Sequence, residues 1–533
     1  MYINFQPHAS GIVYATATVS VREGGRVKKS KEDSIYLGRV LDRERLIFKN
    51  KVDGVFQFDL NSGAKLPPPE DFVPDVRRKN ARVPELYLNF GDVFFLDRFM
   101  RNARVAPLFE AIAYGNPDSL MALACFYMLS KKANRHAEKW YEGSFARILY
   151  PKADLTSQSI GEMLTRIGAE DVIQRFFKAY IPYISRVGKD WGYDVGCAAL
   201  PDDPDEEVDV ADGDGILIDS TGLPNSVRMP ITAVSNRNGE IREEVRLIYV
   251  MQRGTGLPLY MRYVTGNIVD STTLITTMHE LKAVGVDTKF AIMDAGYVTE
   301  ANLRELTASN VSVLARLPES RYVFKRLLEQ HGASLMKPEN LVRYRNRLIY
   351  VKRVKAQIVE GVDGYVYLCV DEGMRSLLMS KLALRAEADN MPLSELRQRT
   401  ENLGAFALVS SRPIAIDKLL PLYYTRQDIE QVFDLSKSYA SLLPVCVQSE
   451  SAFRGHLLLT FLSTVIVRQI QQLGKQRDLD SEEIFERLGN HRCKLFDNTV
   501  LPQEVTRQQS EVYEIFKIVP PKTVTVAKML SVA

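Results

Sequence analysis

The segment Leu422-Tyr-Tyr-Thr-Arg-Gln-Asp-Ile-Glu-Gln-Val-Phe-Asp-Leu-Ser-Lys437 has the residue pattern of an amphipathic helix. Thr425, with an acidic residue three positions later, is a capping signature that predicts a helix beginning near Arg426. At about 100° per residue, the side chains of Arg426, Glu430 and Lys437 fall within roughly 40° of one another. One helix therefore presents a cation, a carboxylate and a second cation along one face.

The apolar residues of this helix form a separate stripe that suits packing on a sheet, namely Ile429, Val432 and Phe433. An ordinary surface ion pair would explain Arg426 with Glu430, but it gives Lys437 no reason to share their face. Asp434 lies near the same face, so helical geometry leaves Glu430 and Asp434 as alternatives.

Two apolar segments earlier in the chain each end in an aspartate: Ile216-Leu-Ile leads to Asp219, and Phe290-Ala-Ile-Met leads to Asp294. Such runs suit strands buried on both faces, and ligands gather at the carboxyl ends of strands in α/β sheets. Asp219 taken alone is better explained as a turn residue, because Gly222, Pro224 and Asn225 follow it. A helix cap is the alternative for Asp294, although Thr299 suits that position better. Because two adjacent carboxylates repel unless a cation lies between them, the pair indicates a metal site.

The spacing Tyr423-x2-Arg426-x3-Glu430-x6-Lys437 resembles the Tyr-Arg-Glu-Lys signature of bacterial insertion-sequence transposases of the DDE superfamily, in the branch often called the IS-four group. Asp219 in Asp-Ser-Thr and Asp294 in Asp-x-Gly-Tyr resemble the first two acidic residues of that family. Two further segments are similar to stretches around its core, Gly266-Asn-x-x-Asp270 and Arg454-Gly-His456. The resemblance covers about residues 216–471 and, more faintly, the N-terminal half.

This resemblance implies an α/β fold with a ribonuclease-H-like core, in which a helix carrying Glu430 lies against the strands that carry Asp219 and Asp294. It also implies that the third acidic residue is Glu430 and not Asp434. By the same match, three residues would contact DNA phosphates near the cut, Tyr423, Arg426 and Lys437.

Two magnesium ions roughly 4 Å apart can activate a nucleophilic oxygen and stabilise the leaving one at phosphorus. We expect Asp219 to bridge two Mg²⁺ ions, with Asp294 and Glu430 each completing one, and Mn²⁺ as a substitute. Water would cut the transposon end, and the released 3′-hydroxyl would attack target DNA. The expected partners are double-stranded DNA with terminal inverted repeats, target DNA and a second copy of the chain.

The stretch between Asp294 and Glu430 is longer than a strand-to-helix crossover requires, which predicts a β-rich insertion at 307–410. Arg343, Arg345 and Arg347 alternate along an expected strand and would share one face. They are candidates for DNA binding, and a solvated strand face explains them equally well. Further basic and aromatic residues of the insertion would extend this surface: Arg321, Lys325, Arg326, Lys352, Arg353, Lys355, Tyr322, Phe324 and Tyr344.

The remaining segments complete the predicted organisation. Residues 1–66 alternate at strand period and form a β-rich region, and 67–200 form a helical region that is a candidate for binding DNA ends. Residues 201–215 are an acidic linker, because the partial likeness to a calcium loop lacks its bidentate Glu. The core comprises 216–306 and 411–475. A C-terminal tail at 476–533 is a candidate for dimerisation.

The overall composition is that of a globular protein, with 533 residues, 46% of them hydrophobic and 25% charged, and a formal charge of +3. Five scattered cysteines without a Cys-x-x-Cys pair indicate reduced thiols, and they argue against a zinc module and a disulfide framework. The most apolar stretch, Leu457 to Val467, is too short for a membrane span and predicts a buried helix. Since no secretory signal is visible, we expect a cytoplasmic, nucleoid-associated protein without membrane partners.

Three other functions were compared with this hypothesis. A tyrosine recombinase needs a His-x-x-Arg box, and none of the six histidines is followed by Arg at the third position. A two-metal nuclease of the same fold would cut DNA without joining strands. A DNA-binding protein derived from a transposase would lack catalysis, although all three acidic positions are filled here.

Overall fold

A computed structural model shows two compact units, Met1–Glu85 and Leu86–Ala533. The structure describes residues 1–8, 13–23, 26–29, 34–69, 72, 86–193, 203, 205–207, 215–237, 240–400, 402–438, 442–443, 445, 447–475, 477–496 and 499–525. Most of the predicted acidic linker at 201–215 therefore lies outside the described residues.

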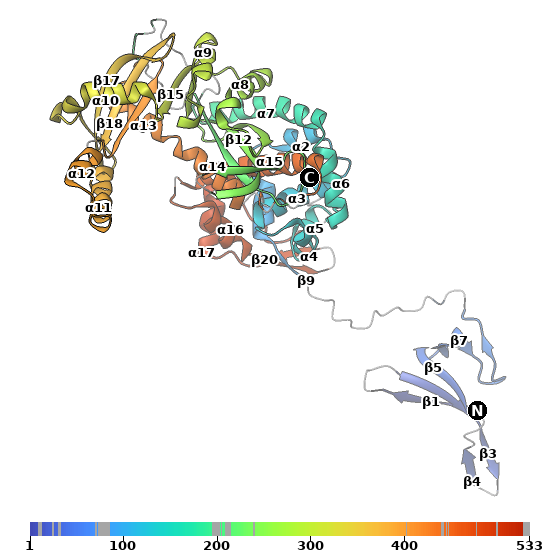
Figure 1. The fold of residues 1–533 in the computed structure, drawn as a ribbon. Coiled ribbons are helices and arrows are strands. Elements are labelled where there is room, and N and C mark those ends of the chain that lie inside the picture. The colour runs from blue at the N-terminus through green and yellow to red at the C-terminus, as the bar shows by residue number, and fades with distance from the viewer. Residues whose placement is uncertain are drawn as a thin grey trace. The chain divides into compact units, whose positions relative to one another are not determined.

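The N-terminal unit contains an antiparallel sheet with the strand order β1-β2-β5-β6-β7-β8 (Figure 1). Its strands are β1 (Tyr2–Pro7), β2 (Val13–Thr18), β5 (Ile35–Asp42), β6 (Ile47–Asn50), β7 (Gly54–Phe58) and β8 (Lys65–Leu66). A separate hairpin pairs β3 (Ser20–Glu23) with β4 (Arg26–Lys29). One face of the sheet carries a small apolar core of its own.

The larger unit begins with a helical region. Its helices are α1 (Gly91–Asn102), α2 (Ala106–Ile112), α3 (Pro117–Leu129), α4 (Ala137–Glu142), α5 (Ala146–Leu149), α6 (Ser157–Ile167) and α7 (Glu170–Asp190). Thr156 has the residue type expected of a helix cap and caps α6, since its side chain accepts a hydrogen bond from the Ser159 N–H. Asp118-Ser119 has the same character in the sequence, but it does not cap α3. Asn116 caps that helix, because Pro117 occupies its first position.

A ten-stranded mixed sheet forms the centre of this unit, in the order β11-β12-β10-β14-β15-β19-β18-β17-β16, with β13 also paired to β12. Its first strands are β10 (Ile216–Pro224), β11 (Ala233–Arg237), β12 (Glu240–Gln252), β13 (Pro258–Thr265), β14 (Phe290–Met293) and β15 (Ser312–Leu317). The strands β12 and β13 form an antiparallel hairpin, and Pro258 begins β13, which pairs with β12 alone among the described strands. The helices α8 (Leu274–Ala283) and α9 (Glu300–Ala308) connect β13, β14 and β15.

The stretch between β15 and β19 contains both strands and helices. It comprises α10 (Tyr322–Leu335), β16 (Leu341–Tyr344), β17 (Arg347–Val359), β18 (Val362–Asp371), α11 (Glu372–Ala388), α12 (Leu393–Thr400) and β19 (Ala405–Ser410). The strands β16 to β19 continue the central sheet, while α11 and α12 lie at the end of this unit remote from α2 to α6 (Figure 1).

The arrangement of the three insertion arginines differs from the prediction. Tyr344 on β16 pairs with Arg347 on β17, so Arg345 and Asn346 form the turn between two strands and do not belong to one continuous strand. Arg345 has a positive φ of 54°. The chain reverses there, and therefore Arg343, Arg345 and Arg347 do not alternate along one strand face.

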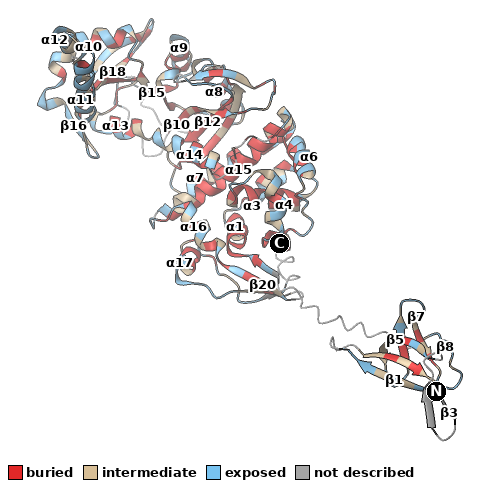
Figure 2. Ribbon diagram, turned by 60° about the horizontal axis from the view of Figure 1, so that its bottom comes forward, coloured by how far each residue is buried: buried red, intermediate tan, exposed pale blue. Residues whose placement is uncertain are grey.

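The helix α15 (Glu450–Lys475) is the core helix of this unit. Of the described helices it alone is long and apolar enough to cross a membrane by length and composition, and 83% of its most apolar window is buried inside the protein. It packs against α3, α6 and α14 (Gln427–Ser438), and Figure 2 shows it buried over most of its length. The predicted buried helix around Leu457 to Val467 is thus confirmed.

The C-terminal residues fold onto the beginning of the same unit. The helices α16 (Ser481–Gly489) and α17 (Arg507–Ile515) accompany a small sheet of β22 (Val524–Thr525), β21 (Thr499–Pro502), β20 (Arg492–Phe496) and β9 (Leu86–Asn89), in that order. Because β20 pairs with β9, this segment is joined to the helical region that precedes the central sheet.

Candidate active site

The two aspartates lie on adjacent parallel strands. The pairing of β10 with β14 runs from Ile216 with Ala291 to Ile218 with Met293, and Asp219 and Asp294 are the next residues on each strand. Their side chains therefore project where the parallel pairing ends. The prediction that Asp219 ends its strand is wrong, because β12 continues to pair with β10 as far as Pro224.

Two short helices bring Arg426 and Glu430 to this position. α13 (Ile416–Tyr424) ends at Thr425, and α14 begins at Gln427, so Arg426 lies at the junction. The predicted capping role of Thr425 is wrong. Its hydroxyl donates to the carbonyl oxygen of Leu422 in α13 at 2.7 Å, and the residue closes the preceding helix.

Packing against the sheet fixes the rotation of α14. Ile429, Val432 and Phe433 are buried, as their predicted stripe requires. The ring of Phe433 stacks on that of Tyr249 with centroids 5.2 Å apart, and Tyr249 pairs directly with Asp219 across β10 and β12. This contact places the charged face of α14 over the aspartates.

One guanidinium joins the three predicted acidic residues. Arg426 Nη1 lies 3.1 Å from Asp219 Oδ2 and 4.0 Å from Asp294 Oδ2, and Arg426 Nη2 lies 3.1 Å from Glu430 Oε1. The structure thus brings Asp219, Asp294 and Glu430 around one cation. Glu430, and not Asp434, is the α14 carboxylate that contacts this arginine.

The site carries more negative charge than Arg426 neutralises. Burial raises the pKa of Asp219 to about 6, and the nearby Asp294 and Asp270 add to this shift, whereas the Ser220 N–H and Arg426 oppose it. Burial by itself lowers the pKa of Arg426, but attraction to the three carboxylates outweighs burial and raises it. A group of three acids around one base favours a further cation.

Sequence reasoning missed a supporting group beside Asp219. The Ser220 hydroxyl donates to Asp270 Oδ1, and Arg246 Nη1 donates to the same oxygen at 2.7 Å. Arg246 is itself buried and lies 3.7 Å from Glu244. Asp270 could have been found from the sequence, because it belongs to the Gly266-Asn-x-x-Asp270 segment that resembles a stretch around the family's core. The position of Arg246 could not, because it depends on the pairing of β10 with β12.

The other two signature residues flank the acidic group. Tyr423 is buried, and this burial raises the pKa of its hydroxyl to about 12. Lys437 Nζ donates to Thr221 Oγ1 at 2.6 Å, two residues along β10 from Asp219. Burial lowers the pKa of Lys437.

Of the three insertion arginines, only Arg347 reaches the surroundings of the site. Its guanidinium binds the buried Asp371 and donates to the Tyr424 hydroxyl at 2.8 Å. Arg345 lies over the ring of Tyr344 at 5.2 Å, and Arg343 Nε donates to the Arg345 carbonyl oxygen. Arg347 is therefore already engaged in a structural ion pair.

A cavity of about 460 Å³ adjoins the acidic group. It lies between the junction of α13 with α14 and the insertion, and three arginines and three carboxylates line it: Arg316, Arg347, Arg426, Glu319, Asp371 and Glu430. Tyr424 also lines it and stacks on Tyr344 at 5.0 Å. Arg426 and Glu430 thus face both the aspartates and a space open to a ligand.

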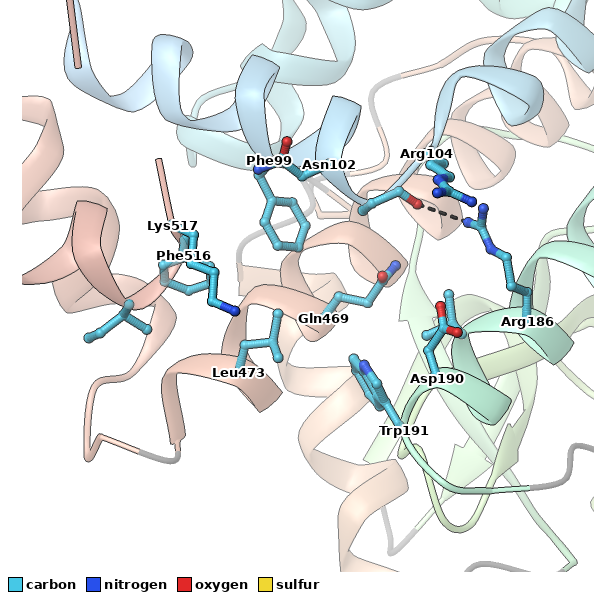
Figure 3. Close-up of a pocket in the computed structure, with 13 residues that line it drawn as sticks. Phe99, Asn102, Arg104, Arg186, Asp190, Trp191, Gln469, Leu473, Phe516 and Lys517 are labelled. Carbon is cyan, nitrogen blue, oxygen red and sulfur yellow. Dashed lines mark hydrogen bonds between the residues drawn. The ribbon is translucent and has the colours of Figure 1, made fainter. Parts of the chain in front are cut away.

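A second cavity of about 470 Å³ lies elsewhere, among the C-terminal ends of α1, α7, α15 and α17 (Figure 3). Trp191, Arg104, Arg186 and Lys517 contribute to its walls, and Arg186 donates to the Ala103 carbonyl oxygen. None of the predicted site residues lines it, so it is separate from the acidic group.

The acidic group offers the kind of ligand atom that a hard divalent cation prefers. Carboxylate oxygens are the ligands that Mg²⁺ and Mn²⁺ prefer. Within the described ranges, no three His, Cys, Asp or Glu side chains stand close enough together to hold a metal ion. The three carboxylates surround Arg426 instead, so metal binding requires this guanidinium to move.

A comparison with known protein families finds a match over the part of the chain that contains this site. Residues 211–466 match the family model described as Transposase DDE domain. This match supports a DDE-type transposase. All three acidic residues and Arg426 fall within the matched range.

Two further comparisons add little. The chain is similar to a solved piggyBac transposase synaptic complex with hairpin DNA, with 8% identity over 80% of each chain and a TM-score of 0.36. A likeness of that size carries no argument about function. No curated protein matches the sequence significantly.

Proposed function

We propose that the chain is a DNA transposase that binds transposon ends, cleaves them and joins them to target DNA at Asp219, Asp294 and Glu430. The observation that carries the proposal is the convergence of these carboxylates on Arg426, at 3.1, 4.0 and 3.1 Å. Acidic side chains from two parallel strands and one helix meet there, within a range that matches a transposase domain.

In this proposal the three carboxylates would hold two divalent ions, Mg²⁺ or Mn²⁺, and such ions would supply the charge that activates an attacking oxygen and stabilises a leaving one. Asp219 is the most enclosed of the three and would serve both ions. The hydrogen bond from the Ser220 N–H to Asp219 Oδ1, at 2.8 Å, orients its carboxylate. Asp270 and Arg246 would hold β10 in place, because Asp270 accepts hydrogen bonds from the Ser220 hydroxyl and from Arg246.

The basic residues would bind the DNA backbone. Arg426 can exchange its carboxylate partners for a phosphate, because it lines the adjoining cavity as well as the acidic group. Lys437 lies on the same face of α14, and Tyr423 forms a wall of the cavity. Arg343 and Arg345 project at the β16–β17 turn, where they would meet DNA at the rim, whereas Arg347 maintains the cavity wall through Asp371.

The proposal includes a ribonuclease-H-like core at 216–306 and 411–475, with residues 307–410 as an insertion, in the IS-four-like branch. The mixed sheet with parallel β10, β14 and β15 supports this assignment. The expected partners remain duplex DNA with terminal inverted repeats, target DNA and a second copy of the chain. A cytoplasmic, nucleoid-associated location and a dimerising role for 476–533 belong to the same proposal.

The test uses the full chain, Mg²⁺ and a duplex that carries the inverted repeat flanking the coding region. Glu430→Gln should reduce cleavage and joining by at least about 100-fold, while Asp434→Asn, one turn along α14, should retain parental activity. Equal activity of Glu430→Gln and the parent would refute the site. A parent protein that cleaves but never joins would be a nuclease and not a transposase.

A further inference from the structure

The sheet of the N-terminal unit has two contrasting faces. Its core face buries six apolar residues, Ala15, Ala17, Leu37, Phe48, Phe56 and Phe58. Side chains on a strand alternate between faces, so the residues between these project to the opposite side. That side consists of strand residues of the described unit which its own core does not cover.

Strand register arranges the opposite side into two rows. Asn4 pairs with Thr16 and Thr16 with Tyr36, which gives the first row across β1, β2 and β5. In the second row, Gln6 pairs with Tyr14, Tyr14 with Arg39, and Arg39 with Lys49. We call these seven residues the polar face.

The composition of the polar face matches a nucleic-acid-binding surface. It contains two tyrosines, two carboxamides, one threonine and two cations, and the next row on the same side consists of Asp42, Ile47 and Gln57. Tyr36 is 58% exposed and pairs with Thr16 on β2, near the beginning of β5. Exposed rings beside cations are the combination with which sheet surfaces stack bases and bind phosphates.

The pairing of Arg39 with Lys49 provides an energetic argument. Like charges directly opposite each other in an antiparallel pair destabilise the sheet. A carboxylate at either position would have stabilised it, as Lys65 and Asp53 do at the neighbouring hairpin. An anion bound between the two cations would remove this repulsion, and a phosphate group is such an anion.

We propose that the polar face binds a DNA strand, with a phosphate between Arg39 and Lys49 and a base on Tyr36. Asn4 and Gln6 lie at the β1 edge of the two rows, where their carboxamides can donate to phosphate or base oxygens. This inference rests on the proposed function for its choice of DNA. It assigns to the N-terminal unit a DNA contact separate from the acidic group.

The test measures binding by fluorescence anisotropy of the full chain, using a labelled oligothymidine and a labelled mixed-sequence duplex over a range of salt concentrations. Arg39→Ala with Lys49→Ala should weaken binding and flatten the dependence of log affinity on log salt, by roughly 0.9 per lost phosphate contact on a duplex. Tyr36→Ala should weaken oligothymidine binding on the order of 10-fold with an unchanged salt slope.

The matched control is Arg45→Ala with Lys51→Ala, which removes two cations from turns of the same unit. This variant should bind like the parent. Equal losses in the two double variants would show a general charge effect and overturn the proposal, as would parental binding by the polar-face variant. Thermal unfolding checks folding: removal of the Arg39–Lys49 repulsion should leave the midpoint unchanged or raise it.

The two proposals fail in different ways. Asp294→Asn should abolish cleavage while both oligonucleotides bind as they do to the parent. If the parent never cleaves DNA but loses binding with the polar-face substitutions, the proposed function fails and the polar face stands. If the parent cleaves and the polar-face variant binds and cleaves normally, only the polar-face proposal fails.

Discussion

At the scale of single residues, Arg426 has the central electrostatic position. It neutralises part of the charge of three carboxylates that would otherwise repel one another. The same carboxylates are the proposed metal ligands, so the guanidinium and a divalent ion compete for them. Under the proposed function, this competition would give Arg426 two partners in sequence, first the acidic group and then a DNA phosphate.

Substitution of Arg426 should separate these two roles. Arg426→Gln removes the internal cation, so the metal-free protein should lose about 1–3 kcal/mol of unfolding free energy. Added Mg²⁺ should then raise its melting temperature more than that of the parent, because no guanidinium has to be displaced. Thermal unfolding with and without Mg²⁺ measures both effects, and Lys437→Gln is the control. An identical Mg²⁺ response in Arg426→Gln and the parent would contradict competition.

Asp219 makes stability depend on pH in a direction opposite to that of an ordinary surface carboxylate. Its pKa is about 6 in the folded protein, above the ordinary value of 3.8, so the folded state binds the proton more tightly than the unfolded state. The stabilising effect of this proton is complete below pH 3.8 and is lost as the pH rises through about 6. At neutral pH the buried charge therefore costs stability.

Asp219→Asn removes that cost. In metal-free buffer at pH 7.5, the variant should be more stable than the parent by about 3 kcal/mol, and the difference should vanish near pH 4. Urea unfolding at the two pH values measures it. A variant less stable than the parent at pH 7.5 would mean that attraction to Arg426 outweighs the cost of burial.

At the scale of elements, local patterns predicted the strands before Asp219 and Asp294, the buried stripe of α14 and the core helix α15, because each depends on residues close in sequence. The pattern could not show that β10 continues past Asp219, since that depends on pairing with β12. The alternation of Arg343, Arg345 and Arg347 failed for a related reason. A two-residue turn reverses the strand there, and neither Arg345 nor Asn346 is a glycine that would have marked it.

The β16–β17 turn yields a direct prediction. Arg345 adopts a φ of 54°, a conformation that costs a residue with a Cβ atom roughly 1 kcal/mol relative to glycine. Arg345→Gly should therefore preserve or raise the unfolding free energy, by up to about 1 kcal/mol. Chemical denaturation measures this change, with Arg343→Gly in β16 as a destabilising control. A loss of stability in Arg345→Gly would show that the Arg345–Tyr344 contact outweighs the backbone strain.

At the scale of the whole molecule, segments distant in sequence combine in ways that composition does not reveal. Two described residues of the acidic stretch contact the insertion, since Lys355 Nζ binds Asp205 at 2.7 Å and Arg353 binds Glu207. A third contact joins the stretch to the residues just after the insertion, where Arg412 donates to the Asp203 carbonyl oxygen. Two of the basic residues assigned to a DNA surface are thus paired within the chain. The sequence contained both charge clusters, but only the fold brings them together.

The division into two units gives the last prediction. The apolar core of the larger unit begins at Leu88 and contains no residue of the N-terminal sheet, whose own core is a separate cluster. A chain that starts at Leu86 should therefore fold, retain the acidic group and unfold at a midpoint within a few degrees of the corresponding transition of the full chain. Calorimetry measures this, because the full chain should show a second transition from the N-terminal sheet. A single transition that shifts strongly on truncation would show that the two cores stabilise each other, and the polar face would then have to be tested as part of one cooperative structure.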